Sequence, residues 1–331
     1  MTALDERPRL AITLGDPRGI GPEIAAAALR DPRVRESCRA TVVGPTGFDL
    51  VPDEVIGAWS GGGKTTAAAP EGRSAATAGL LSALAIERAV ALALAGRVDG
   101  VVTGPIDKHA LLAGGYDFPG HTEMLAALTG VPVAMMLASD RLRVVLATTH
   151  IPLRAVPEAL TAMVITQVAA VTRQGLRDWY GIAEPRIALC ALNPHAGDSG
   201  RFGREDEELL APAARAAGIA GPFPADTVFV RAMRGAFDAV IAPYHDVGMT
   251  AIKVASFGSA VNVTLGLPFP RTSPDHGTAR DIAGLGKADP SSFIAAVLEC
   301  ARIAARITRD SLPPSASPPA SRHAAPPPRG P

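Results

Sequence analysis

Short apolar runs that end in polar residues recur along this chain, and they alternate with helical patterns. The clearest run, 239–242, leads into Tyr244, His245 and Asp246. A short apolar run with such a boundary predicts a buried strand, and the alternation with helices predicts βαβ units around a mostly parallel sheet. Ligands of open α/β sheets bind just beyond the carboxyl ends of the strands. The predicted strands are 10–14, 98–102, 144–147, 187–192 and 239–242, and the predicted helices are 22–30, 76–94, 157–173, 204–217 and 292–306.

Three histidines follow three of these predicted strands. His150, His195 and His245 each stand a few residues beyond an apolar run. A histidine at a strand end often only completes a turn, but three in the same topological position favour a common role. Neutral imidazole is the commonest metal ligand, and three protein ligands with one open position are typical of a catalytic divalent site. The pattern therefore predicts that the three histidines bind one divalent metal ion.

Composition and charge narrow the class of protein. A length of 331 residues favours two α/β domains. Lys+Arg and Asp+Glu both number 32, so the net charge is zero and nothing indicates a nucleic-acid or anionic-membrane surface. Three widely spaced cysteines and an N-terminus without an apolar signal segment predict a reducing, cytoplasmic location.

Three segments are predicted to lie outside this pattern of strands and site loops. Residues 75–96 form the longest apolar stretch, but Glu87 and Arg88 interrupt it, which favours a packed helix over a membrane span. Residues 311–331 are rich in Pro, Ser and Ala and are predicted to be a disordered tail. Residues 55–74, rich in Gly, Ala and Thr, are predicted to be a surface loop or hairpin.

From residue 10 to residue 306 the chain resembles the PdxA family, 4-hydroxythreonine-4-phosphate dehydrogenase and its close relatives. Eight segments match in order, which makes the resemblance specific. They are ITLGDPRGIGPE (12–23), VVTGPIDK (101–108), FPGHTEMLA (118–126), TTHIPL (148–153), LNPHAGDSGRFGREDEE (192–208), GPFPADT (221–227), YHDVGM (244–249) and VNVTLGLPFPRTSPDHGTA (261–279).

The resemblance implies a fold and an assembly. The expected architecture has two α/β/α domains with a cleft between them, related to isocitrate and isopropylmalate dehydrogenases. The first domain is expected to comprise 1–125 plus 272–310 and to carry an NAD loop. The second, 126–271, is expected to hold the metal and substrate residues. The resemblance also implies a homodimer with the metal site at the subunit interface.

The resemblance further implies roles for single residues. The three metal ligands fall on the three histidines above. The implied substrate-binding residues are His121, Thr122, Lys253, Asn262 and Arg271, and the implied cofactor loop includes His276, Gly277, Thr278, Asp281 and Gly284.

The residues themselves leave the roles of Lys253, Asp246 and His121 open. Lys253, within apolar sequence, could neutralise a substrate carboxylate, act as an acid or base, or simply extend its ammonium to solvent. Asp246 could orient a ligand histidine, act as a base, or occupy a turn. For His121, a position just before a helix also fits a plain N-terminal role.

The implied reaction is the NAD- or NADP-dependent oxidation of a secondary alcohol, assisted by Zn²⁺, Co²⁺, Mn²⁺ or Mg²⁺. A divalent cation can polarise the hydroxyl and stabilise the enolate formed when the β-keto acid loses CO₂. Phosphate on the substrate calls for cations such as Arg271. A metal-dependent hydrolase would need the histidines but no NAD loop, and a phosphometabolite-binding protein would need no histidine triad.

Two departures from the family pattern leave the substrate open. Val247 stands where many members have Gln, and Gly-Asp-Pro-Arg (15–18) stands where the vitamin B6 enzymes often have Gly-Glu-Pro-Ala. Relatives acting on 4-phospho-threonate or 4-phospho-erythronate tend to carry Gly-Asp-Pro. The expected substrate is therefore a phosphorylated four-carbon hydroxy acid of the 4-(phosphooxy)-threonine type, with these sugar acids as the alternative.

Overall fold

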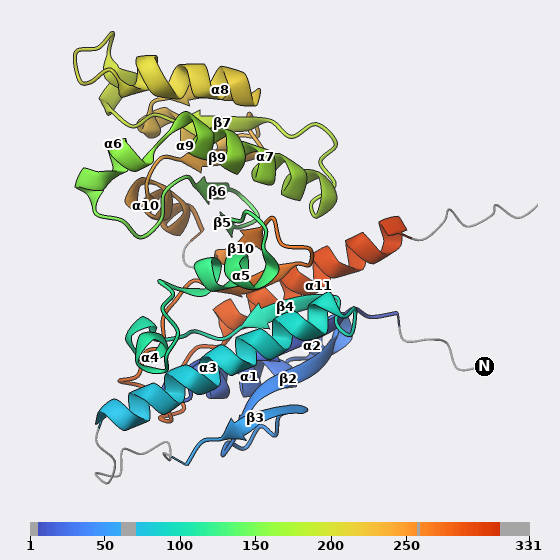
Figure 1. The fold of residues 1–331 in the computed structure, drawn as a ribbon. Coiled ribbons are helices and arrows are strands. Elements are labelled where there is room, and N and C mark those ends of the chain that lie inside the picture. The colour runs from blue at the N-terminus through green and yellow to red at the C-terminus, as the bar shows by residue number, and fades with distance from the viewer. Residues whose placement is uncertain (1–5, 61–70, 257–258, 312–331) are drawn as a thin grey trace, which may run out of the picture.

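The computed structural model describes residues 6–60, 71–256 and 259–311. One eleven-stranded sheet runs through the whole molecule, with helices packed on both of its faces (Figure 1). The predicted disordered tail lies outside the described residues, except for Ser311, which ends the last helix. Part of the segment predicted to be a loop or hairpin, 55–74, is an edge strand, and its residues 61–70 also lie outside the described part.

The strands confirm the predicted runs and add six others. They are β1 (Arg9–Thr13), β2 (Arg39–Thr46), β3 (Glu54–Ala58), β4 (Gly100–Thr103), β5 (Ala134–Ala138), β6 (Arg143–Leu146), β7 (Ile187–Cys190), β8 (Ala220–Phe223), β9 (Ala239–Ala242), β10 (Val261–Leu265) and β11 (Arg271–Pro274).

The helices surround this sheet. They are α1 (Gly21–Arg30), α2 (Pro32–Ser37), α3 (Glu71–Leu94), α4 (Lys108–Ala113), α5 (His121–Thr129), α6 (Val156–Ala159), α7 (Ala162–Asp178), α8 (Ala211–Ala217), α9 (Ala225–Met233), α10 (His245–Ser256) and α11 (Ser291–Ser311), with short turns at Leu153–Ala155, Pro194–Gly197 and Asp206–Leu210.

The strand order divides the sheet into two halves. The order is β3-β2-β1-β4-β11-β10-β5-β6-β9-β7-β8. Strands β1 to β4 and β11 run parallel to one another, as do β6, β7, β8 and β9. Because β10 is antiparallel to both of its neighbours and β5 is antiparallel to β6, the two parallel sets point in opposite directions. We call the β1–β4 and β11 side, with its helices, the first half, and the β6–β9 side the second half.

The two faces of the sheet are covered differently. On one face a single hydrophobic core spans both halves and joins α1, α2 and α11 to α7 and α8. On the other face there are two separate large cores, one beneath α3, α4 and α5 and one beneath α9 and α10. A small further cluster surrounds Trp59. Alternate residues of a strand serve the two faces, as Met136 and Leu137 of β5 illustrate. The gap between the two separate cores lies over the central strands β5, β10 and β11.

Local sequence explains where the helices depart from the prediction. The segment 157–173, predicted as one helix, breaks into α6 and α7 with a bend of 88°. A new helix, α7, begins after Thr161, because the side chain of Thr161 accepts a hydrogen bond from the backbone N–H of Val164 and caps the helix. The segment 204–217 begins as a π-helical turn and continues as α8.

The domain boundaries expected at 125/126 and 271/272 fall inside α5 and β11. The division into those two domains stays a prediction.

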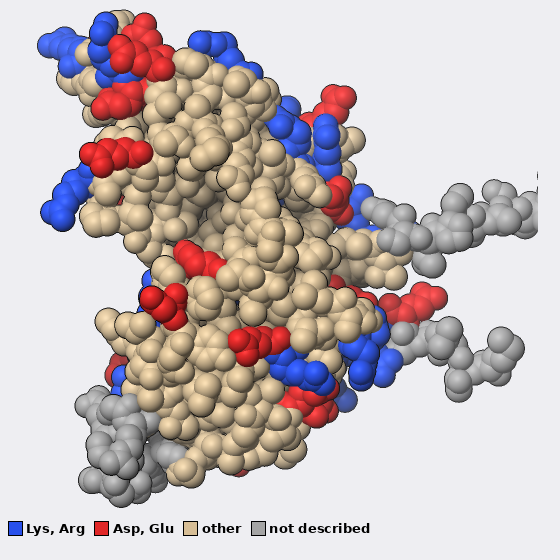
Figure 2. All heavy atoms as spheres, viewed as in Figure 1, with Lys and Arg blue, Asp and Glu red and all other residues tan. Residues whose placement is uncertain are grey.

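Helix α3 accounts for the longest apolar stretch. Among the described residues, Ser74–Leu94 of α3 is the one unbroken helix long and apolar enough to cross a membrane, and 56% of it is buried inside the molecule. It packs against β1, β2 and β4, with Ile86 and Val90 in the core beneath it. On the face shown in Figure 2, acidic and basic side chains are interspersed, in keeping with the zero net charge.

Candidate active site

A cavity of about 290 Å³ lies in the gap between the two separate cores. Met135 and Leu137 of β5, Asn262 of β10, and Arg271 and Ser273 of β11 form its floor. Leu137, Asn262 and Ser273 are register partners across three neighbouring strands. The cleft residues that bear on function are Lys108, His121, Thr122, Glu123, His150, His245, Asn262, Arg271, Asp275, His276 and Gly277.

Arg271 is the most deeply buried charge of this cleft. Only 1% of it is exposed, and it lies at the start of strand β11. Its guanidinium donates to the hydroxyl of Thr264 at 3.0 Å and to the hydroxyl of Thr103. Its Nε has no partner. Burial lowers the pKa of Arg271 to about 9, so it still carries its charge at neutral pH.

His121 stands beside this arginine at the first residue of α5. Its Nε2 is buried without a hydrogen-bond partner. Burial, and then the positive charge of Arg271, hold the pKa of His121 well below its usual range. The ring is therefore neutral at physiological pH, and it can donate or accept one hydrogen bond from a ligand. Thr122 follows it in the cleft wall.

His150 and His245 meet in the cleft. Their ring centroids are 5.5 Å apart, and they follow the neighbouring parallel strands β6 and β9. His245 donates from Nδ1 to a carboxylate oxygen of Asp246 at 2.8 Å, which leaves Nε2 free for a ligand. This contact matches the first of the expected roles for Asp246, the orientation of a histidine. Burial lowers the pKa of His150, with a further lowering from Lys108, so that its ring is also neutral and able to bind a metal.

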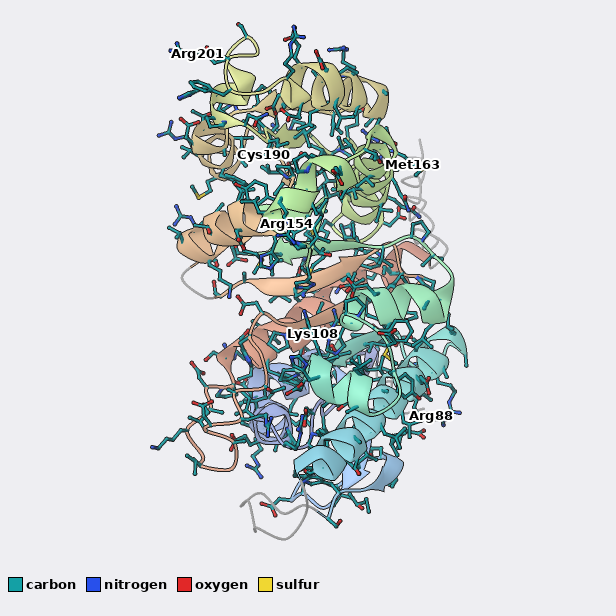
Figure 3. The ribbon with its side chains drawn as sticks, turned by 60° about the vertical axis from the view of Figure 1, so that its left-hand side comes forward. Arg88, Lys108, Arg154, Met163, Cys190 and Arg201 are labelled. Atoms are coloured by element: carbon teal, nitrogen blue, oxygen red, sulfur yellow. The ribbon has the colours of Figure 1, made fainter. Side chains whose placement is uncertain are left out.

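His195 does not join the other two. It is exposed, absent from the cleft lining, and packed beside Phe202, with 6.3 Å between ring centroids. Figure 3 shows Arg201, from the same loop, at the outer end of the second half, whereas Lys108 lies where the two halves meet. Within the described residues no group of three His, Cys, Asp or Glu side chains is arranged to hold a metal ion. One chain therefore brings together two of the three predicted ligands.

The turn that carries His195 has a strained backbone. His195 has φ 55° and Ala196 has φ 56°, values that cost a residue with a side chain about 1–2 kcal/mol each. The buried carboxylate of Asp206 secures the start of the turn, accepting hydrogen bonds from the backbone N–H groups of Leu192 and Asn193 at 2.8 and 2.9 Å. Backbone strain of this kind is concentrated at functional sites.

Lys253 lies on a helix. The apolar sequence around it belongs to α10, and half of the lysine side chain is exposed, which agrees with the alternative of an ammonium that extends to solvent. Apolar residues of α10 face the core at helical spacing, which leaves Lys253 on the outer side. Its ammonium lies 3.5 Å from the nearly buried carboxylate of Asp275, which lines the cleft.

The expected cofactor loop borders the cleft on the side of the first half. His276 and Gly277 line the cavity, and Thr278, Asp281 and Gly284 continue away from it. The backbone carbonyl of Thr278 accepts a hydrogen bond from the N–H of Ile20 at 2.9 Å. Gly19 allows this approach, because a Cβ there would lie 2.6 Å from the same carbonyl oxygen. Gly19 and Ile20, which directly follow the Gly-Asp-Pro-Arg turn, therefore hold the loop in place.

Two charged cleft residues were missed by the sequence reasoning. Lys108 follows the end of β4, and Glu123 lies two residues beyond His121 on α5. The rule that polar groups beyond strand ends build the site could have found Lys108. Glu123 carried no such signal, because an acidic residue in the first turn of a helix is ordinarily explained by the helix dipole.

Solved structures identify the class of fold. The chain resembles a 4-hydroxythreonine-4-phosphate dehydrogenase of Klebsiella pneumoniae with a TM-score of 0.75 and 38% identity, covering 90% of this chain and 99% of that one. A β-decarboxylating dehydrogenase of Thermococcus kodakarensis, 16% identical with a TM-score of 0.50, shares the fold over 88% of this chain and 81% of its own. The protein is thus a dehydrogenase with the α/β architecture of the isocitrate and isopropylmalate dehydrogenases.

Sequence relatives identify the family. The model of the "Pyridoxal phosphate biosynthetic protein PdxA" family matches residues 53–300. A 4-hydroxythreonine-4-phosphate dehydrogenase of Desulforapulum autotrophicum is 46% identical over 92% of this chain and 97% of its own length. A D-threonate 4-phosphate dehydrogenase of Cupriavidus necator is 42% identical over 91% of this chain and 99% of its own. The chain belongs to the PdxA family.

Proposed function

We propose that this dehydrogenase oxidises the secondary alcohol of 4-(phosphooxy)-threonine with NAD or NADP and a divalent metal ion, and that the β-keto acid formed then loses CO₂. The observation that carries the proposal is the buried Arg271, whose guanidinium keeps an unpartnered N–H on the cleft floor. A charge so costly to bury is kept where a substrate anion compensates it. A planar guanidinium fork can bind two oxygens of a phosphate or a carboxylate at once, and the proposed substrate offers a phosphate to it.

The residues around Arg271 fit the rest of such a substrate. His121, held neutral, and Asn262, whose side-chain oxygen is also unpartnered, offer polar contacts along the floor. His150 and His245 suit a divalent cation because both rings lie in the cleft and Asp246 fixes the orientation of one of them. When bound, the metal ion would polarise the hydroxyl and stabilise enolate charge, and the nicotinamide would accept the hydride. His276 and Gly277 border the space left for the cofactor.

The alternative substrate within the same reaction class is 4-phospho-threonate. It is supported by the similarity to a D-threonate 4-phosphate dehydrogenase and by the Gly-Asp-Pro-Arg turn. An absorbance assay of nicotinamide reduction with 4-(phosphooxy)-threonine, 4-phospho-threonate and 4-phospho-erythronate tests the proposal. We expect the first to give the highest kcat/KM. Turnover of none of the three would contradict the proposed substrate class. A cytoplasmic location is part of the same proposal.

The position of His195 supports a shared metal site in a homodimer. His195 is exposed and does not line the cleft of its own chain, as expected of a ligand offered to a second copy. We expect a mixture of inactive His195→Ala chains and inactive His245→Ala chains to regain activity. With equal mixing, up to half of the dimers would be heterodimers, each with one intact site, so about a quarter of the wild-type sites would be restored.

Each mutant protein measured alone serves as the control. Mass spectrometry of the mixture must also show that the subunits have exchanged. If exchange is complete and no activity returns, each chain builds its own site and the shared-site proposal is wrong.

A further inference from the structure

The cleft contains several buried polar atoms that no described residue satisfies. Besides His121 Nε2, Asn262 Oδ1 and Arg271 Nε, they include Glu123 Oε2. A buried polar atom without a partner typically costs about 1–3 kcal/mol, more if it is charged. Such atoms concentrated in one cavity indicate that a ligand supplies their partners. A carboxylate can only accept hydrogen bonds, so Glu123 calls for a donor on that ligand.

Lys108 lies next to Glu123 on the same wall of the cleft. A Cβ built on Gly120 would lie 3.5 Å from Glu123 Oε2 and 3.8 Å from Lys108 Cε, so the two side chains converge on this glycine. No ion pair within 4.0 Å joins them or engages either with another residue in the described part of the chain. Figure 3 shows Lys108 at the level where the two halves meet.

Both charges act on His150, one of the histidine pair. Lys108 lowers the pKa of His150 and Glu123 raises it, after the larger effect of burial. The pair of charges therefore lies beside the histidines, whereas Arg271 is fixed on the floor between Thr264 and Thr103. The cleft thus offers two separate positive groups and, beside one of them, an acceptor that lacks a donor.

This arrangement matches the amino-acid end of a phosphorylated amino acid. With the phosphate on Arg271, the carboxylate needs the second positive group, and the neighbouring ammonium needs the acceptor. We propose that Lys108 contacts the substrate carboxylate and that Glu123 accepts a hydrogen bond from the adjacent α-ammonium. Glu123 then sets the preference for an amino acid over the hydroxy acid of the same length. The inference rests on the proposed function, because it assumes a phosphorylated four-carbon acid in the cleft.

The test compares two substrates on two variants. Glu123→Gln keeps the size of the side chain but loses its charge. We expect it to lower kcat/KM for 4-(phosphooxy)-threonine about tenfold to a hundredfold, because a charge-assisted contact is lost, and to lower that for 4-phospho-threonate by less than about tenfold. Lys108→Ala should lower both values by similar factors, because both compounds carry the carboxylate. Neither variant should change the KM of the nicotinamide cofactor.

The matched controls are Asp117→Asn and Arg97→Ala, both at exposed positions outside the cleft lining. They should leave both kcat/KM values unchanged. If Glu123→Gln lowers the two values equally, or changes neither, the assignment of Glu123 to the ammonium is wrong. If it lowers the melting temperature with no change in the ratio of the two values, Glu123 only supports the start of α5.

Calorimetric binding of the same two acids, without nicotinamide cofactor, separates this inference from the proposed function. Wild-type protein that binds both acids but oxidises neither would contradict the function alone. Wild-type protein that oxidises 4-(phosphooxy)-threonine, combined with an unchanged substrate ratio in Glu123→Gln, would contradict the inference alone.

Discussion

Removal of divalent metal is expected to reduce turnover to background, and Zn²⁺, Co²⁺, Mn²⁺ or Mg²⁺ is expected to restore it. The physical reason is that the alcohol must lose a proton, and a Lewis acid contributes several kcal/mol to that step, equal to at least about a thousandfold in rate. His245→Ala should have the same effect as chelation, because His245 and His150 meet in the cleft with their rings 5.5 Å apart. The measurement is the rate of nicotinamide reduction before chelation, after it, and after metal is returned.

His109→Ala is the matched control for His245→Ala, since His109 is exposed on α4 and does not line the cavity. It should keep the wild-type rate and metal content. Full activity in protein shown to be metal-free would mean that the reaction does not need a metal ion bound by His150 and His245.

Substitution of Arg271 by alanine is expected to raise the KM of the phosphorylated substrate about tenfold to a hundredfold, as the loss of a charge-assisted contact typically costs ~1.5–3 kcal/mol. In the protein without substrate, two effects oppose each other. The variant loses the hydrogen bonds to Thr264 and Thr103, but it also loses a charge whose burial is unfavourable. We therefore expect a small change in the melting temperature without substrate and the loss of the rise that substrate gives to the wild type.

Arg271→Lys should recover only part of the affinity, because an ammonium cannot bind two phosphate oxygens in the guanidinium geometry. Arg88→Ala is the control, since Arg88 pairs with Glu54 at 2.9 Å on the surface of the first half (Figure 3). An unchanged substrate KM in Arg271→Ala would show that Arg271 stabilises the sheet and does not bind the substrate.

The sequence predicted five of the eleven described strands and the regions of α1, α3, α7, α8 and α11, because their apolar patterns reflect burial against the sheet. It placed His150 and His245 correctly relative to each other, since neighbouring parallel strands end at the same edge. The position of His195 could not be predicted, because it depends on positive φ angles in a single turn. The burial of Arg271 could not be predicted either, because in the sequence Arg271 is only part of a polar break after an apolar run.

The sequence could not decide between the alternatives for Lys253 for a different reason. An apolar stretch of this length fits a strand or a helix equally well, and the two periods place the lysine on different sides. Glu123 was overlooked because a single charged residue in the first turn of a helix carries no pattern in sequence, whereas Lys108, which follows the end of β4, could have been found from its position. Their significance comes only from the cavity and from the absence of partners for them among the described residues.

The core that spans both halves on one face of the sheet has a consequence for the cooperativity of unfolding. Residues as far apart in sequence as Ile24 of α1 and Leu210 next to α8 belong to the same continuous cluster. Neither half can lose its packing without exposing apolar surface of the other, so the two should unfold together in one transition. On the opposite face the cores are separate, and there the walls of the cleft can change composition with little cost to the stability of the whole. In such a scaffold the continuous core on one face of the sheet holds the two halves together, and residues of the cleft on the other face can vary.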